Sequence, residues 1–362
     1  MGNAQQYGEG QMKAAFFEQH GGPEVLRYGD RPDPEPGPGE VRVAIRAAAL
    51  NRLDVFVRNG IPDVPLPQIP GGDGAGIVER LGEGVSGLTP GDRVLIQPGL
   101  YCGACEFCLG GEQSLCVRYR ILGEHVAGTF AGLVVVPPRN LFRVPEGMSF
   151  VRACAFPLAY QTAWRMIIGR ARVRPGETVL IHGAGGGVAG AALEIARLAG
   201  ARVIATTSGE EKSGWLREAG AELVVDYAKE DVGAVVRRHT SKRGVDVVVD
   251  VTGEATWMTS LRSAAKGGRI VTCGATTGPN PKEEIRLIFW KQLSILGSTM
   301  ANEREFRALL HAVTAGRLRP RIDSVHPLSR AADAYARMES GRQHGKIVLV
   351  PDGVEVEWPD GD

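Results

Sequence analysis

Four of the six cysteines stand close together in the sequence, at spacings that suit a metal ion. They are Cys102, Cys105, Cys108 and Cys116. Thiolates at such short spacings bind one tetrahedral Zn²⁺ in a closed, structural arrangement. The first three are too close together for each to find its own disulfide partner easily. We therefore predict a structural zinc lobe over about residues 98–120, with an iron–sulfur cluster as the alternative. Cys154 and Cys273 lie in apolar runs and are predicted to be inert buried thiols.

A glycine-rich turn follows one predicted strand and precedes a predicted helix. The strand covers residues 177–182, the turn reads Gly183-Ala-Gly-Gly-Gly-Val-Ala-Gly190, and a second strand covers 201–206. Glycines permit the tight turn and let backbone N–H groups approach a pyrophosphate at the helix N-terminus. The turn therefore predicts a dinucleotide site, and a plain strand-to-helix turn is the alternative. The predicted contacts are Gly185, Gly186, Gly187 and Val188.

The end of the second strand bears on the choice of nicotinamide cofactor. An NAD-preferring site commonly places an acidic residue there to bind the ribose 2′-OH, but this strand ends in Thr206-Thr207-Ser208. Thr207, Ser208 and the nearby Lys212 offer hydroxyls and a cation to a 2′-phosphate. Glu210 and Glu211 come later and are expected to begin a helix, where acids suit the helix dipole. We therefore favour NADP(H) over NAD(H).

The elements that position these motifs change in character near residue 150. Residues 12–150 read as short strands divided by turn residues, with little helix beyond residues 51–59. After residue 150, apolar strands alternate with helical segments, which predicts a parallel sheet wrapped by crossover helices. The strands are expected at 177–182, 201–206, 222–226, 245–250, 268–274 and 294–297. A helix over 303–315 and a strand over 346–350 close the chain.

Length and charge limit the functional classes. A chain of 362 residues is long enough for two domains. Its formal net charge of +1 gives no basic field for nucleic acid or an anionic membrane surface. No apolar run is long enough to span a bilayer, and residues 1–11 read as a flexible tail rather than a secretory signal. We therefore expect a soluble, cytoplasmic protein, with an acidic tail over 351–362.

Taken together, these features resemble the zinc-type medium-chain dehydrogenase/reductase family, and more closely its quinone oxidoreductase-like branch. The resemblance runs from Met12 to about Val350. It is carried by Gly21-Gly-Pro-Glu-Val-Leu, Ala48-Ala-Leu-Asn-Arg-Leu-Asp, Gly71-Gly-Asp-Gly-Ala-Gly, the cysteine lobe, the glycine turn and Gly345-Lys-Ile-Val-Leu. It implies an α/β fold in which a Rossmann domain, a doubly wound parallel sheet (153–297), is inserted in a β-rich GroES-like catalytic domain (12–152 and 298–350), with the active cleft between them.

The resemblance also implies further cofactor contacts. Thr162 matches a nicotinamide contact, and Tyr227 matches a position at the adenosine phosphate end of NADP(H). Two backbone segments match segments that line the cofactor, and their residues are Val251, Thr252, Cys273, Gly274 and Ala275.

Three departures from the family pattern decide the predicted chemistry. Family alcohol dehydrogenases hold a catalytic zinc with a Cys, a His and a further Cys, and the matching positions here are Asn51, Gly72 and Leu158. None of these is a good zinc ligand. Asp73 matches the acidic neighbour of the ligand histidine, but a carboxylate alone makes no site. For His125 a structural role is favoured over metal ligation.

Without a Lewis acid, hydride transfer to an unactivated carbonyl loses its main charge stabiliser. Hydride addition to a conjugated C=C demands less, so we expect NADPH-dependent reduction of an α,β-unsaturated ketone, aldehyde or quinone. Asn51 is a candidate donor to the substrate oxygen and Tyr160 a candidate proton donor, with packing as the alternative for both. Asp54 is expected to cap or pair within its helix. The rival hypotheses are an atypical zinc-dependent alcohol dehydrogenase using Asp73, Glu124 or His125, a cofactor-binding protein with little turnover, and a dedicated biosynthetic reductase of one elaborate intermediate.

Assembly is predicted from one apolar stretch. Leu287-Ile-Phe-Trp290 and Leu293-Ser-Ile-Leu296 resemble the edge through which family Rossmann domains pair. Exposed apolar edge surface is otherwise an aggregation hazard. A homodimer is therefore favoured over a simple buried final strand.

Overall fold

The computed structural model describes residues 7–355, which form two compact units. Residues 7–158 and 320–355 make the first unit, and residues 159–319 make the second. The sequence prediction instead gave residues 153–158 to the inserted domain and 298–319 to the outer one. Residues 303–314 belong with the second unit, where Glu305 forms a buried ion pair of 2.8 Å with Arg165.

The first unit is built on a seven-stranded sheet with the order β16-β17-β3-β4-β5-β9, and β8 also pairs with β3. Its strands are β1 (Tyr7–Phe16), β2 (Arg27–Pro34), β3 (Val41–Ala49), β4 (Asp73–Leu81), β5 (Arg93–Ile96), β6 (Gly99–Leu100), β7 (Arg120–Ile121), β8 (Leu133–Val136), β9 (Leu141–Arg143), β16 (Ile322–Pro327) and β17 (Lys346–Val350). Its helices are α1 (Arg52–Asn59), α2 (Glu106–Leu109), α3 (Phe150–Cys154) and α11 (Ala331–Glu339), with short 3-10 turns at Pro23–Val25, Gln113–Leu115, Pro138–Asn140 and Leu328–Arg330.

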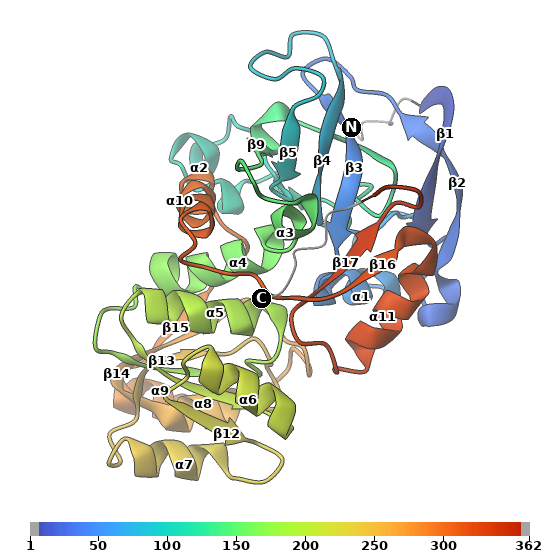
Figure 1. The fold of residues 1–362 in the computed structure, drawn as a ribbon. Coiled ribbons are helices and arrows are strands. Elements are labelled where there is room, and N and C mark those ends of the chain that lie inside the picture. Colours follow the sequence, from blue (N-terminus) through green and yellow to red (C-terminus); the bar gives the residue numbers. More distant parts are fainter. Residues whose placement is uncertain (1–6, 356–362) are drawn as a thin grey trace. The chain divides into compact units, whose positions relative to one another are not determined.

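The two ends of the chain meet inside this sheet. β17 pairs antiparallel with β3, with Val348 opposite Ala49 and Leu349 opposite Ala48. β3 in turn pairs antiparallel with β4, with Ala49 opposite Asp73. Alternate residues of these strands point into one apolar core that includes Val43, Ile45 and Ile347. Figure 1 shows β17, from the end of the chain, beside β3, from near its beginning.

The second unit is a doubly wound parallel sheet with the strand order β12-β11-β10-β13-β14-β15. Its strands are β10 (Thr178–Ile181), β11 (Arg202–Thr207), β12 (Leu223–Asp226), β13 (Val245–Val249), β14 (Ala264–Thr272) and β15 (Ser294–Gly297). Its helices are α4 (Pro157–Trp164), which begins at the boundary of the units, a π-helical stretch η4 (Arg165–Arg170), α5 (Gly187–Leu198), α6 (Glu210–Glu218), α7 (Val232–His239), α8 (Trp257–Ser263), α9 (Ile285–Lys291) and α10 (Glu303–Thr314). All neighbouring strands of this sheet are parallel. The predicted fold class is therefore confirmed.

The central strands β10, β11 and β13 read as near-continuous apolar runs because both of their faces are covered. Leu180, Ile204 and Val248 are fully buried and share one core with residues of α7 and α8. The predicted strands and helices of this unit occur with shifts of a few residues at their ends. The helices over 257–263 and 285–291 were not predicted, because each is only seven residues long and too short to show a clear helical period.

The predictions for the tails need correction. Residues 7–11 were assigned to a flexible tail but belong to β1, where Gln11 pairs with Pro32 of β2. Asp352 was assigned to the acidic tail, yet its carboxylate accepts hydrogen bonds from the hydroxyls of Tyr28 and Ser329, at 2.8 and 2.6 Å. The tail predictions for residues 1–6 and 356–362 fall outside the described residues. None of the helices within residues 7–355 has the length and apolar character needed to cross a membrane.

Candidate active site and metal centre

The four clustered cysteines converge as the sequence predicts. Their sulfur atoms all lie within 4.8 Å of one another, and the Sγ atoms of Cys102 and Cys108 are 3.8 Å apart. A tetrahedral Zn²⁺ with Zn–S bonds of about 2.3 Å separates its sulfurs by roughly 3.8 Å. None of the six cysteines, all of which lie in the described part of the chain, forms a disulfide. This donor set fits one structural zinc ion.

Backbone N–H groups prepare the sulfurs of this lobe for a metal. The amides of Ala104 and Cys105 donate to the Sγ of Cys102 at 3.4 and 3.3 Å, and the amide of Arg118 donates to the Sγ of Cys116 at 3.3 Å. The bonds from Ala104 and Cys105 lower the pKa of Cys102 to about 5. Because zinc binds the thiolate form, these bonds favour metal binding at neutral pH.

In the second unit, the predicted cofactor residues gather at one edge of the parallel sheet. Apart from Thr162 on α4 and Lys212 on α6, each lies just beyond, or at, the carboxyl end of a strand, and the carboxyl ends of parallel strands meet at the same edge. Residues 185–188 follow β10, residues 207 and 208 end β11, Tyr227 follows β12, residues 251 and 252 follow β13, and residues 273–275 follow β14. The strand order reverses direction at β10, which is where such sheets bind nucleotides.

The glycine turn has the local geometry that a phosphate site requires. Gly186 is the N-cap of α5, which begins at Gly187 directly after the turn. A Cβ on Gly185 would come within 2.8 Å of the Lys212 side chain and 3.2 Å of the Thr207 hydroxyl. Lys212 and Thr207 therefore lie directly beside the turn. Thr207 itself is buried, being 3 % exposed.

Tyr227 and Ser208 are also brought together at this edge. The Tyr227 hydroxyl lies 3.1 Å from the Ser208 hydroxyl, and the Tyr227 amide donates to the carbonyl oxygen of Thr207 at 3.0 Å. Tyr227 remains 55 % exposed. An exposed aromatic ring beside hydroxyls at this edge is available to a nucleotide.

The segments after β13 and β14 hold each other in place. Thr277 N–H donates to the carbonyl oxygen of Thr252 at 2.8 Å, and the Thr276 hydroxyl donates to that of Val251 at 2.8 Å. Beneath them, the buried carboxylate of Asp250 accepts hydrogen bonds from the amides of Thr252 and Gly253, each at 3.0 Å. Sequence reasoning missed Asp250, although an acid at the end of an apolar strand was a usable signal.

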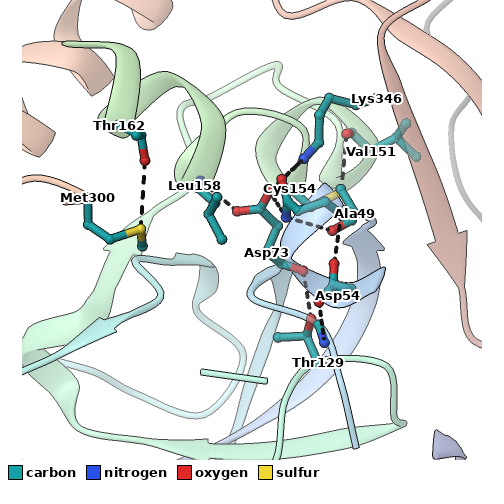
Figure 2. Close-up of polar contacts among 12 residues, drawn as sticks. Ala49, Asp54, Asp73, Thr129, Val151, Cys154, Leu158, Thr162, Met300 and Lys346 are labelled. Carbon is teal, nitrogen blue, oxygen red and sulfur yellow. Dashed lines mark hydrogen bonds and ion pairs between the residues drawn. The ribbon is translucent and has the colours of Figure 1, made fainter. Parts of the chain in front are cut away.

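Two predicted site residues lie on α4, with different surroundings. The Thr162 hydroxyl contacts the sulfur of Met300 at 3.7 Å (Figure 2). The Tyr160 hydroxyl donates to Glu194 at 2.7 Å, and burial raises its pKa well above the ordinary value. Its proton is directed to a carboxylate and is held tightly, which does not favour the expected role of proton donor.

Gly72 and Leu158, two of the positions that match zinc ligands in the family, pack against each other. A Cβ on Gly72 would come within 2.9 Å of the Leu158 Cδ1, so the leucine side chain occupies the space beside the glycine. Leu158 is 7 % exposed. Within residues 7–355, the four-cysteine lobe is the only group of three or more His, Cys, Asp or Glu side chains arranged to share an ion.

A buried polar cluster surrounds Asp73 instead. The Lys346 ammonium donates to the side-chain oxygen of Asn51 (Oδ1) at 2.5 Å and to Asp73 Oδ2 at 2.9 Å. The other carboxylate oxygen of Asp73 accepts the Leu158 amide at 2.7 Å. Figure 2 shows Lys346 and Leu158 approaching Asp73 from different segments. We name Asn51, Asp73 and Lys346 the buried charge cluster.

The Asn51 side chain is fully engaged in this cluster. Its amide nitrogen donates to Asp73 Oδ2 at 3.0 Å and to the carbonyl oxygen of Ala49 at 3.3 Å, while its oxygen accepts from Lys346. Both N–H groups of the carboxamide are therefore used inside the protein, which does not favour the expected role of donor to the substrate. Sequence reasoning named Lys346 only as part of a motif, although a lysine that opens an apolar strand is a usable signal.

Asp54 supports the cluster from the first turn of α1. Its carboxylate accepts hydrogen bonds from the backbone amides of Asn51 at 2.7 Å and Gly71 at 3.0 Å. The predicted capping role is confirmed. Burial raises the pKa of Asp54 to about 7, against the lowering effect of these bonds and of Lys346.

His125 lies in the loop that follows β7, near Glu124. Its Nδ1 accepts the Ile121 amide at 3.2 Å, and its Nε2 is 3.8 Å from the Glu124 carboxylate. Burial raises the pKa of Glu124. By accepting this hydrogen bond, His125 Nδ1 holds the loop after β7 in place, in line with the predicted structural role.

Comparison with known proteins gives the class to which this fold and site belong. Residues 37–146 match the alcohol dehydrogenase GroES-like domain, and residues 187–315 match the family described as zinc-binding dehydrogenase. Acryloyl-coenzyme A reductase of Metallosphaera sedula is 33 % identical over 88 % of this chain and 94 % of its own. Quinone oxidoreductase of Pseudomonas aeruginosa is 32 % identical over 94 % of this chain and 99 % of its own.

A solved structure is similar at higher identity and carries a different description. It is a structure of an NAD-dependent alcohol dehydrogenase, 48 % identical, with a TM-score of 0.90 over 94 % of this chain and 99 % of its own. Further relatives also bear the name alcohol dehydrogenase.

These matches, together with the fold and the cysteine lobe, identify the chain as an oxidoreductase. The chain belongs to the zinc-binding medium-chain dehydrogenase/reductase family. Its relatives divide between alcohol dehydrogenases and quinone or enoyl reductases.

Proposed function

We propose that this protein reduces the conjugated C=C bond of an enone, enal or quinone with NADPH, without a catalytic metal. One observation carries the proposal: the Lys346 ammonium sits between Asn51 and Asp73, at positions that match zinc ligands and their neighbour in family alcohol dehydrogenases. A cation bonded to the buried carboxylate repels a divalent metal, and Gly72 and Leu158 offer no side-chain donor. The second unit serves as the cofactor-binding domain and the first as the catalytic domain.

The proposed reaction balances without a metal. A hydride leaves the nicotinamide C4 of NADPH and forms a C–H bond at the β-carbon of the substrate, giving NADP⁺. The π electrons of the C=C bond move toward the carbonyl, so the negative charge rests on its oxygen as an enolate. A proton from solvent then adds to the α-carbon; for a quinone, protons add to oxygen and give the hydroquinone. Catalysis comes from aligning the hydride donor with the acceptor carbon and stabilising the oxyanion.

The preference for NADP(H) rests on the edge of the second unit. Thr207 and Lys212 lie beside the glycine turn, and Ser208 and Tyr227 follow on the same edge. No acidic side chain occupies the end of β11. The NAD-dependent description of one similar structure favours the other cofactor, so both must be assayed.

The relatives include enzymes named for two reactions, reduction of a conjugated acceptor and dehydrogenation of an alcohol. Reduction of acryloyl-coenzyme A and of quinones requires hydride addition to a conjugated system, as proposed here. Alcohol dehydrogenation is the second candidate, and the similar NAD-dependent alcohol dehydrogenase structure favours it. A dedicated biosynthetic reductase is a narrower form of the first chemistry.

Steady-state assays with a matched panel separate these candidates. NADPH and NADH oxidation is followed with an enone, an enal, a quinone and an unsaturated acyl thioester, and NADP⁺ and NAD⁺ reduction with simple alcohols. The proposal predicts turnover of the conjugated acceptors with NADPH and little oxidation of alcohols. Alcohol oxidation that depends on a second metal ion per chain would contradict it, and tight NADPH binding without any turnover would point to a non-enzymatic role.

The proposed assembly is a homodimer through the edge of the second unit. β15 forms one edge of the six-stranded sheet, and the neighbouring α9 exposes Phe289 and Trp290 at 61 % and 75 %. Another copy pairing at this edge covers apolar surface that water otherwise contacts. Light scattering of the wild type and of Trp290→Lys tests this: the dimer should dissociate in the variant, and a wild-type monomer would overturn it.

A further inference from the structure

We propose that the second unit carries a binding site for a small anion with two or more phosphate groups, in a hollow beside α7 and α8. The hollow has a volume of about 870 Å³, which is in the range of small-ligand sites. Three arginines line it, namely Arg237, Arg238 and Arg262, and we name it the arginine hollow. The inference concerns the second unit alone and does not depend on the proposed reaction.

The packing of two helices brings these arginines together. Arg237 and Arg238 lie in the last turn of α7, and Arg262 lies in the last turn of α8. Val236 of α7 and Leu261 of α8 are fully buried in the same apolar core. Figure 1 shows both helices in the second unit. The arginines are therefore carried by packed helices and not by a loose loop.

The arginines lie at a different edge of the sheet from the predicted cofactor residues. α7 leads into β13 and α8 leads into β14, so the last turns of both helices lie at the amino edge of the parallel sheet. The glycine turn follows β10 and lies at the carboxyl edge. An anion held by these arginines is therefore a second ligand and not a part of the dinucleotide.

The positive charges of the arginine hollow have no acidic partner. Within residues 7–355, none of its three arginines forms an ion pair, whereas Arg202 of the same unit pairs with Glu222 at 2.6 Å. One acid, Asp231, also lines the hollow, but its carboxylate caps α7 by accepting the Ala234 amide at 2.7 Å. The hollow therefore has an excess of positive charge that an anion can balance.

Stabilising the helix ends is the competing explanation for these cations, because a positive charge near a helix C-terminus favours the helix dipole. The end of α8 already has such a charge. The Lys291 ammonium donates to three carbonyl oxygens there, those of Leu261, Arg262 and Ala264, at 3.0, 2.8 and 2.8 Å. Burial lowers the pKa of Lys291, and the nearby charge of Arg237 lowers it further. Cations that disfavour one another are not explained by helix capping alone.

The chemistry of the lining suits phosphate. A guanidinium group presents N–H donors in a planar fork that matches two oxygens of a phosphate group. The Ser241 side chain lines the same hollow and adds a hydroxyl. A ligand with two or more phosphate groups brings enough negative charge to balance three arginines, which a single phosphate group does not.

Calorimetric titration with inorganic pyrophosphate tests the proposal, with orthophosphate for comparison. The protein is kept saturated with NADPH or NADH, whichever binds, because the glycine turn can itself bind pyrophosphate. If neither binds, the same proteins are compared without cofactor. Zinc content is checked after titration, because pyrophosphate can chelate metal ions.

The variants are Arg237→Gln, Arg262→Gln and the double variant. The matched control is the double variant Arg304→Gln/Arg307→Gln, which removes two exposed positive charges from α10 in the same unit. Thermal unfolding shows whether each variant is folded. Arg237→Lys keeps the charge but removes the fork.

We expect the wild type to bind one pyrophosphate per chain, more tightly than orthophosphate. Each single variant should weaken pyrophosphate binding about 10-fold, as expected for loss of one charge-assisted hydrogen bond. The double variant should weaken it more than either, and Arg237→Lys should lie between the wild type and Arg237→Gln. The control on α10 should bind as the wild type does.

Three results would overturn the inference. The first is no pyrophosphate binding by the wild type. The second is equal weakening in the control on α10, which would mean general attraction to surface charge. The third is a lower unfolding temperature in Arg237→Gln and Arg262→Gln with an unchanged dissociation constant, which would make the arginines helix-capping residues only.

Discussion

The cysteine lobe and the buried charge cluster lie in the same unit, and both concentrate negative charge, but they differ in the source of the balancing cation. In the lobe, four thiolates stand within 4.8 Å of one another, and backbone amides point at their sulfurs. In the cluster, a carboxylate is balanced by the Lys346 ammonium and by amide donors. A concentrated negative charge requires a cation in both places, and the chain supplies its own cation only in the second. The Asp73 carboxylate is therefore already balanced within the protein, whereas the four thiolates of the lobe require a bound metal ion.

Removing a zinc ligand from the cysteine lobe should have the largest effect on zinc content and stability. Cys105→Ser removes one of four zinc ligands, so zinc content should fall from one per chain toward zero and the unfolding temperature should drop sharply. Structural zinc contributes on the order of 10 kcal/mol in zinc-finger peptides. Metal analysis and calorimetry measure both changes. Cys154→Ala, at a buried thiol away from the lobe, should keep one zinc per chain, and equal zinc loss there would break the distinction.

The next effect concerns Asp54, which supports the buried charge cluster, and the dependence of stability on pH. The pKa of Asp54 is raised to about 7 by burial, so the folded state binds this proton more tightly than the unfolded chain. Stability should therefore fall as pH rises from about 4 to about 7 and then level off. A shift of about three pKa units corresponds to roughly 4 kcal/mol over that window.

Denaturant unfolding at several pH values checks this. Asp54→Asn should flatten the slope between pH 4 and 7, because it removes the titrating group. Asp63→Asn, at an exposed carboxylate, is the control and should leave the slope in place. An unchanged slope in Asp54→Asn would show that another group titrates.

The packing of Gly72 against Leu158 should have a smaller effect on stability. Gly72→Ala places a Cβ within 2.9 Å of the Leu158 side chain, so it should destabilise the protein by about 1–3 kcal/mol. Leu158→Ala alone leaves a cavity, but the double variant makes room for the new methyl group. A double-mutant cycle by denaturant unfolding should show that the double variant loses less than the sum of the two; strict additivity would contradict the proposed contact.

The smallest effect concerns the cofactor. Lys212→Ala should raise KM for NADPH about 10-fold, as expected for loss of one charge-assisted hydrogen bond, and leave KM for NADH nearly unchanged. Lys242→Ala, at an exposed lysine after α7, should change neither constant. Equal losses for both cofactors would remove the argument for a 2′-phosphate contact.

Sequence patterns predicted the regular parts of this molecule well, for a physical reason. The alternation of apolar strands with helices, the glycine turn before α5 and the short cysteine spacings are local signals, and the structure contains each of them. The capping role of Asp54 was likewise readable from its place three residues after Asn51.

The parts that sequence reasoning missed depend on residues far apart in the chain. The contacts of Lys346 with Asn51 and Asp73 exist only because β17 and β4 both pair with β3. The hydroxyl of Tyr160, on α4, donates a hydrogen bond to Glu194, which lies 34 residues later on α5. Both catalytic expectations, for Asn51 and Tyr160, ignored partners that only the tertiary structure supplies.

Metal analysis of the purified protein, combined with an assay of NADPH-dependent turnover of a conjugated acceptor, distinguishes metal-free reduction from zinc-dependent catalysis. We expect one zinc per chain, lost on substitution of a lobe cysteine, and turnover that needs no second metal. Two metal ions per chain, with turnover abolished when the more weakly held one is removed, would contradict it.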